Sequence, residues 1–204
     1  MTRARPDGTD IRAMTLADRP AVASALAAAF FDDPVLSWVV PGARRRRARM
    51  ERFFALGMDR LWLAHGEGFT HDEHVGAALW VAPGAWHLGV LDQARAAPAL
   101  ARAFGRDLPR LAWVGNALER RHPKAEHWYL PIVGVDPAHQ GRGFGEALMR
   151  PMLDRCDAEG TPAYLEASSE RSRPLYERLG FVVTEELRYA RNAPPLWAMW
   201  REPA

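Results

Sequence analysis

The stretch His127–Gly145, HWYLPIVGVDPAHQGRGFG, decides the fold of this chain. Its first part is apolar and β-branched, so we predict a strand over Trp128–Val135 that ends at the turn Asp136-Pro137. The segment Gly141–Gly145 then carries a glycine at every second position and leads into a helix. Such a loop exposes backbone N–H groups without helical acceptors, at the positive end of the helix dipole. The stretch therefore predicts a site for a phosphate or pyrophosphate group.

The rest of the chain alternates between helical and strand patterns. Ser172 is expected to be the N-cap of a short helix that runs to Leu179, and Gly180 is expected to end it. The segment 86–121 reads as helical with breaks at Pro98, Gly105 and Pro109. The other expected elements are strands at Ile11–Met14, Phe69–His71, Val75–Val81, Ala163–Ala167, Phe181–Ala190 and Leu196–Arg201, and helices at Ala21–Phe31, Arg44–Ala64 and from the glycine loop to Gly160.

This order of elements predicts a mixed α/β fold around one sheet. With 204 residues, we expect a single domain over 1–204. Its cofactor-binding core is expected at about 127–181, and helical elements on the acceptor side at about 18–64 and 86–121.

Composition narrows the functional classes. The chain is 48% apolar and 25% charged, with a net charge of +2, which is typical of a globular protein and gives no argument for nucleic-acid binding. The basic run Arg44–Arg47 is read as a solvated helix start, ahead of a nucleic-acid or membrane patch. No apolar run is long enough to span a membrane, the N-terminus lacks a signal-peptide pattern, and Cys156 is the single cysteine. A cytoplasmic location is expected.

The glycine loop fits neither common dinucleotide nor nucleotide motif. Its glycine spacing does not match Gly-x-Gly-x-x-Gly, and it lacks the Lys-Ser/Thr that ends a P-loop. It does match Gln-x-x-Gly-x-Gly, beginning at Gln140. A plain connection between strand and helix is the alternative for this loop taken alone.

A second motif, Pro174–Phe181 (PLYERLGF), makes the pattern more specific. Together the two motifs resemble the GNAT family of acyl-CoA-dependent N-acetyltransferases, over Trp128–Phe181. From His122 to Trp200 the chain looks most like the puromycin N-acetyltransferase branch of that family. The resemblance implies a mostly antiparallel central sheet, flanked by helices and splayed at the central strand.

The resemblance also implies roles for matching residues. Backbone groups of Val133, Gly134 and Val135 would bond the pantetheine arm of acetyl-CoA, and Tyr176 would protonate the departing thiolate. Gln140 opens the pyrophosphate loop, whose binding amides would be those of Gly141, Arg142, Gly143, Phe144, Gly145 and Glu146.

Tyr176 suits this role chemically, because a phenol is protonated at neutral pH and can donate a proton. The alternative is an amphipathic helix residue packed on the sheet. Ser172 stands where the family often has asparagine, so its contact with the cofactor is in question. Arg171 and Arg173 are candidates for the 3′-phosphate, with solvated arginines as the alternative.

The group that deprotonates the amine is not fixed by the sequence. The candidates are Asp32, Asp33, Glu126, His127, Tyr129 and Glu166. Each has a structural alternative: a helix stop or cap for the aspartates, a surface position for His127 and an ion pair for Glu166. A water chain is also plausible. The segment His71–His74 (HDEH) is a weak metal motif, and we expect a hairpin turn there and no metal.

The expected function is transfer of an acetyl group from acetyl-CoA to a primary amine of a small, antibiotic-like molecule, by direct attack. Acetylation of a peptide or protein N-terminus and a non-catalytic CoA-binding regulator are the alternatives. The expected assembly is a monomer or homodimer, without nucleic acid or membrane as a partner.

Overall fold

The computed structural model describes residues 10–87 and 89–204, and the descriptions below refer to that part of the chain. The strands are β1 (Ile11–Ala13), β2 (Gly66–His71), β3 (Gly76–Val81), β4 (Trp128–Val135), β5 (Ala163–Ala167), β6 (Val182–Leu187) and β7 (Leu196–Arg201). The helices are α1 (Arg19–Ala29), α2 (Pro34–Val39), α3 (Ala43–Gly57), α4 (Val90–Phe104), α5 (Leu108–Arg121), α6 (Phe144–Glu159) and α7 (Arg173–Arg178). Short helical turns are η2 (Leu16–Asp18), η3 (Met58–Trp62), η4 (Gly105–Asp107) and η5 (Pro137–His139).

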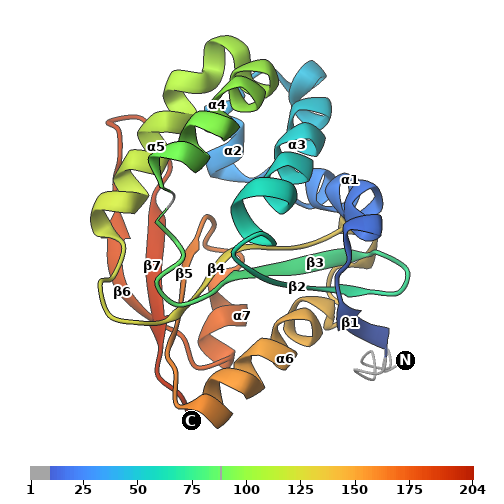
Figure 1. The fold of residues 1–204 in the computed structure, drawn as a ribbon, viewed down its shortest axis with the longest axis vertical. Helices are drawn as coiled ribbons and strands as arrows, with labels where there is room; N and C mark the ends of the chain where they lie inside the picture. The colour runs from blue at the N-terminus through green and yellow to red at the C-terminus, as the bar shows by residue number, and fades with distance from the viewer. Residues whose placement is uncertain (1–9, 88) are drawn as a thin grey trace.

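The strands form one seven-stranded sheet in the order β1-β2-β3-β4-β5-β7-β6. Every neighbouring pair is antiparallel except β4 and β5, which run parallel. Helices α1 to α5 cover one face of the sheet, and α6 and α7 lie on the other (Figure 1). The mixed, mostly antiparallel α/β fold expected from the sequence is therefore confirmed.

Side-chain alternation along the strands builds a separate core on each face. On β3, Ala78 and Trp80 pack in the cluster that contains the apolar side of α6. Ala77 and Leu79 point the opposite way, into the cluster formed with α1 and α3. This period-2 pattern keeps both faces of β3 buried, as expected for a central strand.

The sheet opens between its two parallel strands. The last paired residues of β4 and β5 are Leu130 and Leu165, although both strands continue beyond them. The register with β3 shifts at the same level, because Leu79 pairs with Ile132 but Val81 pairs with Tyr129. This irregularity is a β-bulge, which places one extra residue in β4 and bends the strand. Pro131 lies within it and has no N–H to donate, so the pairing with β5 ends and the strands splay.

Three local expectations differ from the structure, and one short helix was not predicted. The segment 35–40 contains a short helix, α2, whose N-cap Asp33 accepts a hydrogen bond from the Leu36 N–H at 2.9 Å. Pro98 was expected to break the helix, but it is an exposed residue inside α4 and the helix continues through it. The strand expected at 181–190 covers only Val182–Leu187, and the helix expected over 44–64 ends at Gly57 and continues as the turn η3.

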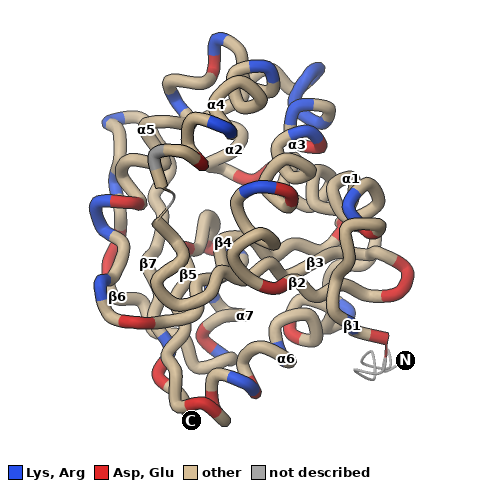
Figure 2. Tube along the Cα trace, in the orientation of Figure 1, with Lys and Arg blue, Asp and Glu red and all other residues tan. Residues whose placement is uncertain are grey.

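The basic run at the start of α3 is not uniformly solvated. Arg46 is buried and donates hydrogen bonds to the carbonyls of Phe31, Val40 and Pro41, so it supports the chain on either side of α2. The other Lys and Arg residues on α3, α4 and α5 spread over their outer surfaces (Figure 2). None of the described helices is long and apolar enough to cross a bilayer.

Candidate functional site

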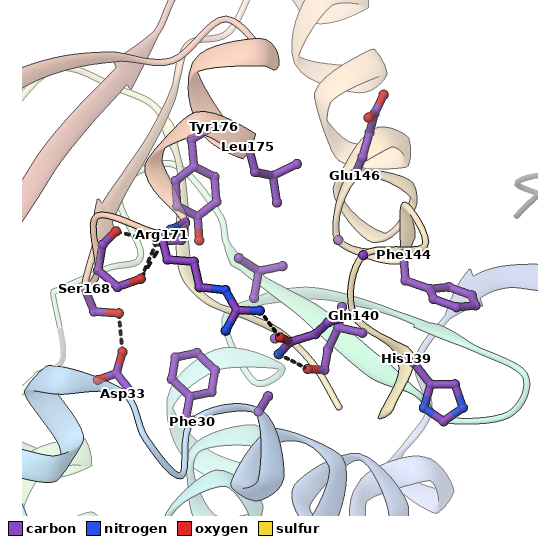
Figure 3. Close-up of a pocket in the computed structure, with 18 of the residues that line it drawn as sticks. Phe30, Asp33, His139, Gln140, Phe144, Glu146, Ser168, Arg171, Leu175 and Tyr176 are labelled. Atoms are coloured by element: carbon purple, nitrogen blue, oxygen red, sulfur yellow. Dashed lines mark hydrogen bonds between the residues drawn. The ribbon is translucent and has the colours of Figure 1, made fainter. Parts of the chain in front are cut away.

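A cavity of about 750 Å³ opens where β4 and β5 diverge. Its walls are the end of β4, the glycine loop, the link between α1 and α2, and the segment from β5 into α7 (Figure 3). The residues expected from the sequence to bind cofactor or donate a proton all line it: Val133, Gly134, Val135, Gln140, Gly141, Arg142, Gly143, Phe144, Gly145, Glu146, Ser172 and Tyr176. The fold thus gathers two sequence motifs that lie about 30 residues apart around one space.

The far half of β4 presents backbone groups to this cavity. The Asp136 N–H donates to the Val75 carbonyl at 2.8 Å, and Val135 pairs with Gly76. By the alternation of an antiparallel ladder, the N–H and C=O groups of Val133 and Val135 point away from β3, toward the open side. Those of Gly134 point toward β3. Gly134 is needed for packing, because a Cβ there would lie 2.8 Å from Phe30 Cε2 on the adjoining helix end.

The glycine loop is held in a conformation that only glycine adopts readily. Gly141 and Gly143 have φ values of 73° and 90°, in the left-handed region. Gly143 is the N-cap of α6, and the N–H groups of the first helical turn follow it without helical acceptors. The Gln140 side-chain amide donates to the Val135 carbonyl at 2.9 Å and fixes the loop to β4. These features make an anion site at the N-terminus of a 16-residue helix.

Cationic side chains lie beside this anion site. The Arg171 guanidinium donates to Gln140 Oε1 at 2.9 Å, which brings it to the rim of the loop (Figure 3). The Arg142 guanidinium lies 5.1 Å from the centre of the Phe144 ring. Arg173 contacts the Trp197 ring and Glu177, and it does not line the cavity. Arg178 also lines the cavity, but its guanidinium donates to the Pro174 carbonyl on α7. Arg142 and Arg171 are therefore the cavity arginines that lie at the glycine loop.

Tyr176 is buried on α7, and its hydroxyl points into the cavity (Figure 3). The pKa of Tyr176 is raised to about 12, chiefly by burial; the Ser172 hydroxyl opposes this rise and the nearby charge of Asp33 adds to it. The phenol is therefore protonated at neutral pH. Ser172 occupies the N-cap position as predicted, but its hydroxyl donates to the Ser169 carbonyl at 2.9 Å and makes no cap bond. The expected side-chain cap is wrong, because the Ser169 turn competes for that hydroxyl.

Asp33 forms the acidic end of the cavity. One carboxylate oxygen accepts from Leu36 N–H, and the other accepts a short hydrogen bond from the Ser168 hydroxyl on the segment after β5. Burial raises the pKa of Asp33, while these two hydrogen bonds lower it. Asp32 also lines the cavity. The structure thus brings both candidate aspartates to the site, and Asp33 lies across the cavity from Tyr176 (Figure 3).

The other candidates for the base do not line the cavity. Tyr129 and Glu166 form a hydrogen bond of 2.8 Å between the phenol and Glu166 Oε2. His127 is 1% exposed, so its alternative as a surface residue is wrong. It contacts His122, a residue that sequence reasoning missed. The sequence did hold a sign that polar residues gather on this side of β5. In the alternation Tyr164-x-Glu166-x-Ser168, three polar side chains lie on one face of the strand, where partners such as His122 could be sought.

The histidines of the HDEH segment have separate partners. The Nδ1 atom of His71 accepts from the Glu73 N–H, and Nε2 of His74 lies 2.7 Å from Asp18. Within residues 10–87 and 89–204, no group of three potential metal ligands is found. Trp113 lies on α5 and is 58% exposed.

Comparison with known proteins assigns this architecture to a family. Residues 110–181 match the model of the acetyltransferase (GNAT) family. An uncharacterized N-acetyltransferase of Schizosaccharomyces pombe is 31% identical over 202 residues, which cover 91% of this chain and 80% of the relative. The chain belongs to the GNAT acetyltransferase family. Its expected family membership is confirmed.

Other proteins similar to this chain are also described as acetyltransferases. A Corynebacterium glutamicum structure described as histone acetyltransferase HPA2 and related acetyltransferase superimposes with a TM-score of 0.73 at 30% identity, covering 95% of this chain and 96% of the other. A mycothiol acetyltransferase of Beutenbergia cavernae is 42% identical over 62 residues, only 29% of this chain and 21% of the relative. These similarities support acetyl transfer and leave the acceptor unspecified.

Members of the GNAT family use acetyl-CoA as co-substrate, and the residues of this acetyltransferase fit that molecule. The open edge of β4 offers amides to a pantetheine chain, and the left-handed glycines expose α6 amides to a pyrophosphate. A side chain at Gly145 would be 3.1 Å from Leu175, so α6 and α7 pack closely beside this loop.

Proposed function

We propose that this protein transfers an acetyl group from acetyl-CoA to a primary amine of a small molecule. The observation that carries the proposal is the pairing of Tyr176 with Asp33 across one cavity whose other walls suit acetyl-CoA. A proton donor for the leaving group and a carboxylate for a cationic amine are the two groups that such a transfer requires at its opposite ends.

The binding roles follow from the walls of the cavity. The open-edge groups of Val133 and Val135 bond the pantetheine arm, and the amides of the glycine loop hold the pyrophosphate. Arg142 and Arg171 supply positive charge for the phosphates. The hydroxyl of Ser172 is engaged with Ser169, so its contact to the cofactor requires a change of partner.

The chemistry is a direct attack. The acceptor amine, held at Asp33, attacks the thioester carbon while a backbone N–H of β4 stabilises the developing oxyanion. The carbon–sulfur bond then breaks, and Tyr176 gives its proton to the sulfur. Cys156 is buried and its pKa is raised to about 11 by burial, so no covalent acetyl-cysteine step is assigned to it.

The acceptor is proposed to be a small, antibiotic-like amine. The resemblance of residues 122–200 to the puromycin N-acetyltransferase branch supports this choice. A peptide or protein N-terminus and a CoA-binding regulator without turnover are the alternatives that the experiment must separate.

The test measures thiol release from acetyl-CoA over a panel of amines that includes puromycin, simple alkylamines and peptides with free N-termini. We expect turnover on small amines, and a loss of about 10²-fold or more in kcat for Tyr176→Phe with unchanged acetyl-CoA affinity. Tyr189→Phe, which also deletes one phenolic oxygen but lies outside the cavity wall, is the matched control. Acetyl-CoA binding without turnover on any amine would support the regulator, and absence of binding would refute both functions.

A further inference from the structure

A buried polar cluster lies on the face of the sheet that α1 to α5 cover, at the point where β4 and β5 separate. Its members are His122, His127, Tyr129, Tyr164 and Glu166. The side chains of His122 and Glu166 are only 2% and 5% exposed. Burying five polar side chains together is costly unless their hydrogen bonds are satisfied, so the position of each proton in the cluster matters.

The protons of the two imidazoles can be assigned from their partners. His127 Nδ1 lies 2.7 Å from the Ala125 carbonyl, which can only accept, so this nitrogen carries the hydrogen. Burial lowers the pKa of His127, and the ring is neutral, so its Nε2 is an acceptor. His122 Nε2, 3.0 Å from it, must then be the donor. Burial lowers the pKa of His122 to about 3, which leaves its Nδ1 with a free lone pair.

That lone pair faces an oxygen that lacks a donor. His122 Nδ1 lies 3.9 Å from Glu166 Oε1. This oxygen is buried and has no hydrogen-bond partner among the described residues, whereas Oε2 accepts from Tyr129. Two acceptors that face each other in a buried place are stabilised by one added proton. Glu166 Oε1 is therefore a buried acceptor that an added proton would satisfy, and the Tyr164 hydroxyl is the other oxygen of the cluster without a partner in the described part of the chain.

Glu166 does not itself line the cavity, but it lies close along β5 to a residue that does. It is the first residue of β5 beyond the last pair with β4, Leu130 with Leu165. Ser168, two residues further on the same side of the chain, lines the cavity and holds Asp33. Two residues along a strand span about 6.5 Å, so Glu166 stands at the closed end of the splay, next to the proposed amine site.

We propose that Glu166 receives the proton that the acceptor ammonium must lose, and that His122 and Tyr129 are positioning residues that hold its carboxylate. This inference rests on the proposed acetyl transfer. The net reaction of an ammonium with a thioester gives an amide, a thiol and one proton, and Glu166 takes that proton. The second proton that leaves nitrogen replaces the one that Tyr176 gives to sulfur.

The electrostatics of the cluster support this role. Burial raises the pKa of Glu166 to about 7, and the hydrogen bond from the Tyr129 hydroxyl limits the rise. The titratable groups that face Glu166 are thus Tyr129 from β4, Tyr164 from β5 itself and His122 from the segment after α5. A base whose pKa lies near the working pH combines availability with proton affinity.

The first experiment compares two kinds of acceptor with Glu166→Gln. An alkylamine is protonated at neutral pH and needs a base, whereas a weakly basic aromatic amine is already neutral. We expect kcat/KM to fall about 10²-fold or more for the alkylamine and to stay within a few-fold for the aromatic amine. Equal losses on both, or no loss on either, would overturn the assignment, because a structural role does not distinguish the two acceptors.

The second experiment uses the pH profile and serves even if no aromatic amine is turned over. Tyr129→Phe removes a donor that holds the pKa of Glu166 down. The acid limb of kcat/KM for the alkylamine should therefore move to higher pH, and Glu166→Gln should remove that limb. An unmoved limb in both variants would refute the proposal. Wild-type protein that turns over no amine would instead refute the proposed function, so the two failures are distinguishable.

Discussion

Glu166 should make the stability of this protein depend on pH in a way that its amide variant does not. Glu166→Gln keeps the shape of the side chain and removes its titration. Burial raises the pKa of Glu166 from its ordinary value of 4.5 to about 7. A tenfold change in proton affinity corresponds to ~1.4 kcal/mol, so this rise corresponds to about 3 kcal/mol between folded and unfolded protein.

The sign follows from which state holds the proton. Between about pH 4.5 and 7 the folded protein keeps the proton on Glu166, whereas the unfolded chain releases it. The folded state therefore binds more protons, and the free energy of unfolding falls as the pH rises through this window. The stabilising contribution is complete below 4.5 and is lost above about 7. Relative to Glu166→Gln, the wild type should lose about 3 kcal/mol from pH 4.5 to pH 8.

The assay is urea unfolding of both proteins at several pH values from 4.5 to 8, followed by tryptophan fluorescence. Groups that titrate identically in both proteins cancel in the difference between the two unfolding free energies. Glu170→Gln, which removes the same charge at an exposed position after β5, is the control and should give a curve parallel to wild type. A difference for Glu166→Gln that stays constant across this range would refute the reasoning that a carboxylate is buried there.

Three further substitutions test the cavity walls. Gly134→Ala should lower the free energy of unfolding by about 1–3 kcal/mol in urea unfolding, because its Cβ would lie 2.8 Å from Phe30 Cε2, and an unchanged midpoint would contradict the packing of α1 on β4. Gly143→Ala should cost about 1–2 kcal/mol and weaken acetyl-CoA binding in calorimetry, since its φ is 90°; Gly115→Ala, in open space within α5, should instead be neutral or stabilising. Asp33→Asn keeps an acceptor for the α2 cap and should raise KM for cationic amines without changing acetyl-CoA affinity. Equal KM values for the variant and the wild type would refute the proposed contact between Asp33 and the ammonium group.

The elements on the proposed cofactor side of the cavity were largely predictable from the sequence. The strand Trp128–Val135 and the glycine loop were found because a strand, a tight turn and a helix start are local features, and each leaves its pattern within a few residues. The motif PLYERLGF likewise placed Tyr176 on a short helix. The bulge at Pro131, which opens the sheet, had a local sign as well, because proline in a strand is confined to edges and bulges.

The acceptor side was decided by tertiary structure. Asp33 and Ser168 are 135 positions apart, and their hydrogen bond exists only because α2 is folded over the end of β5. His122 and Glu166 meet at 3.9 Å across two elements, and no periodicity links them in the chain. The sequence by itself determined the glycine loop and the short helix that carries Tyr176, since both depend on local backbone geometry. Which carboxylates lie at the proposed amine site depends on burial and on partners from distant segments, and only the folded sheet provides these.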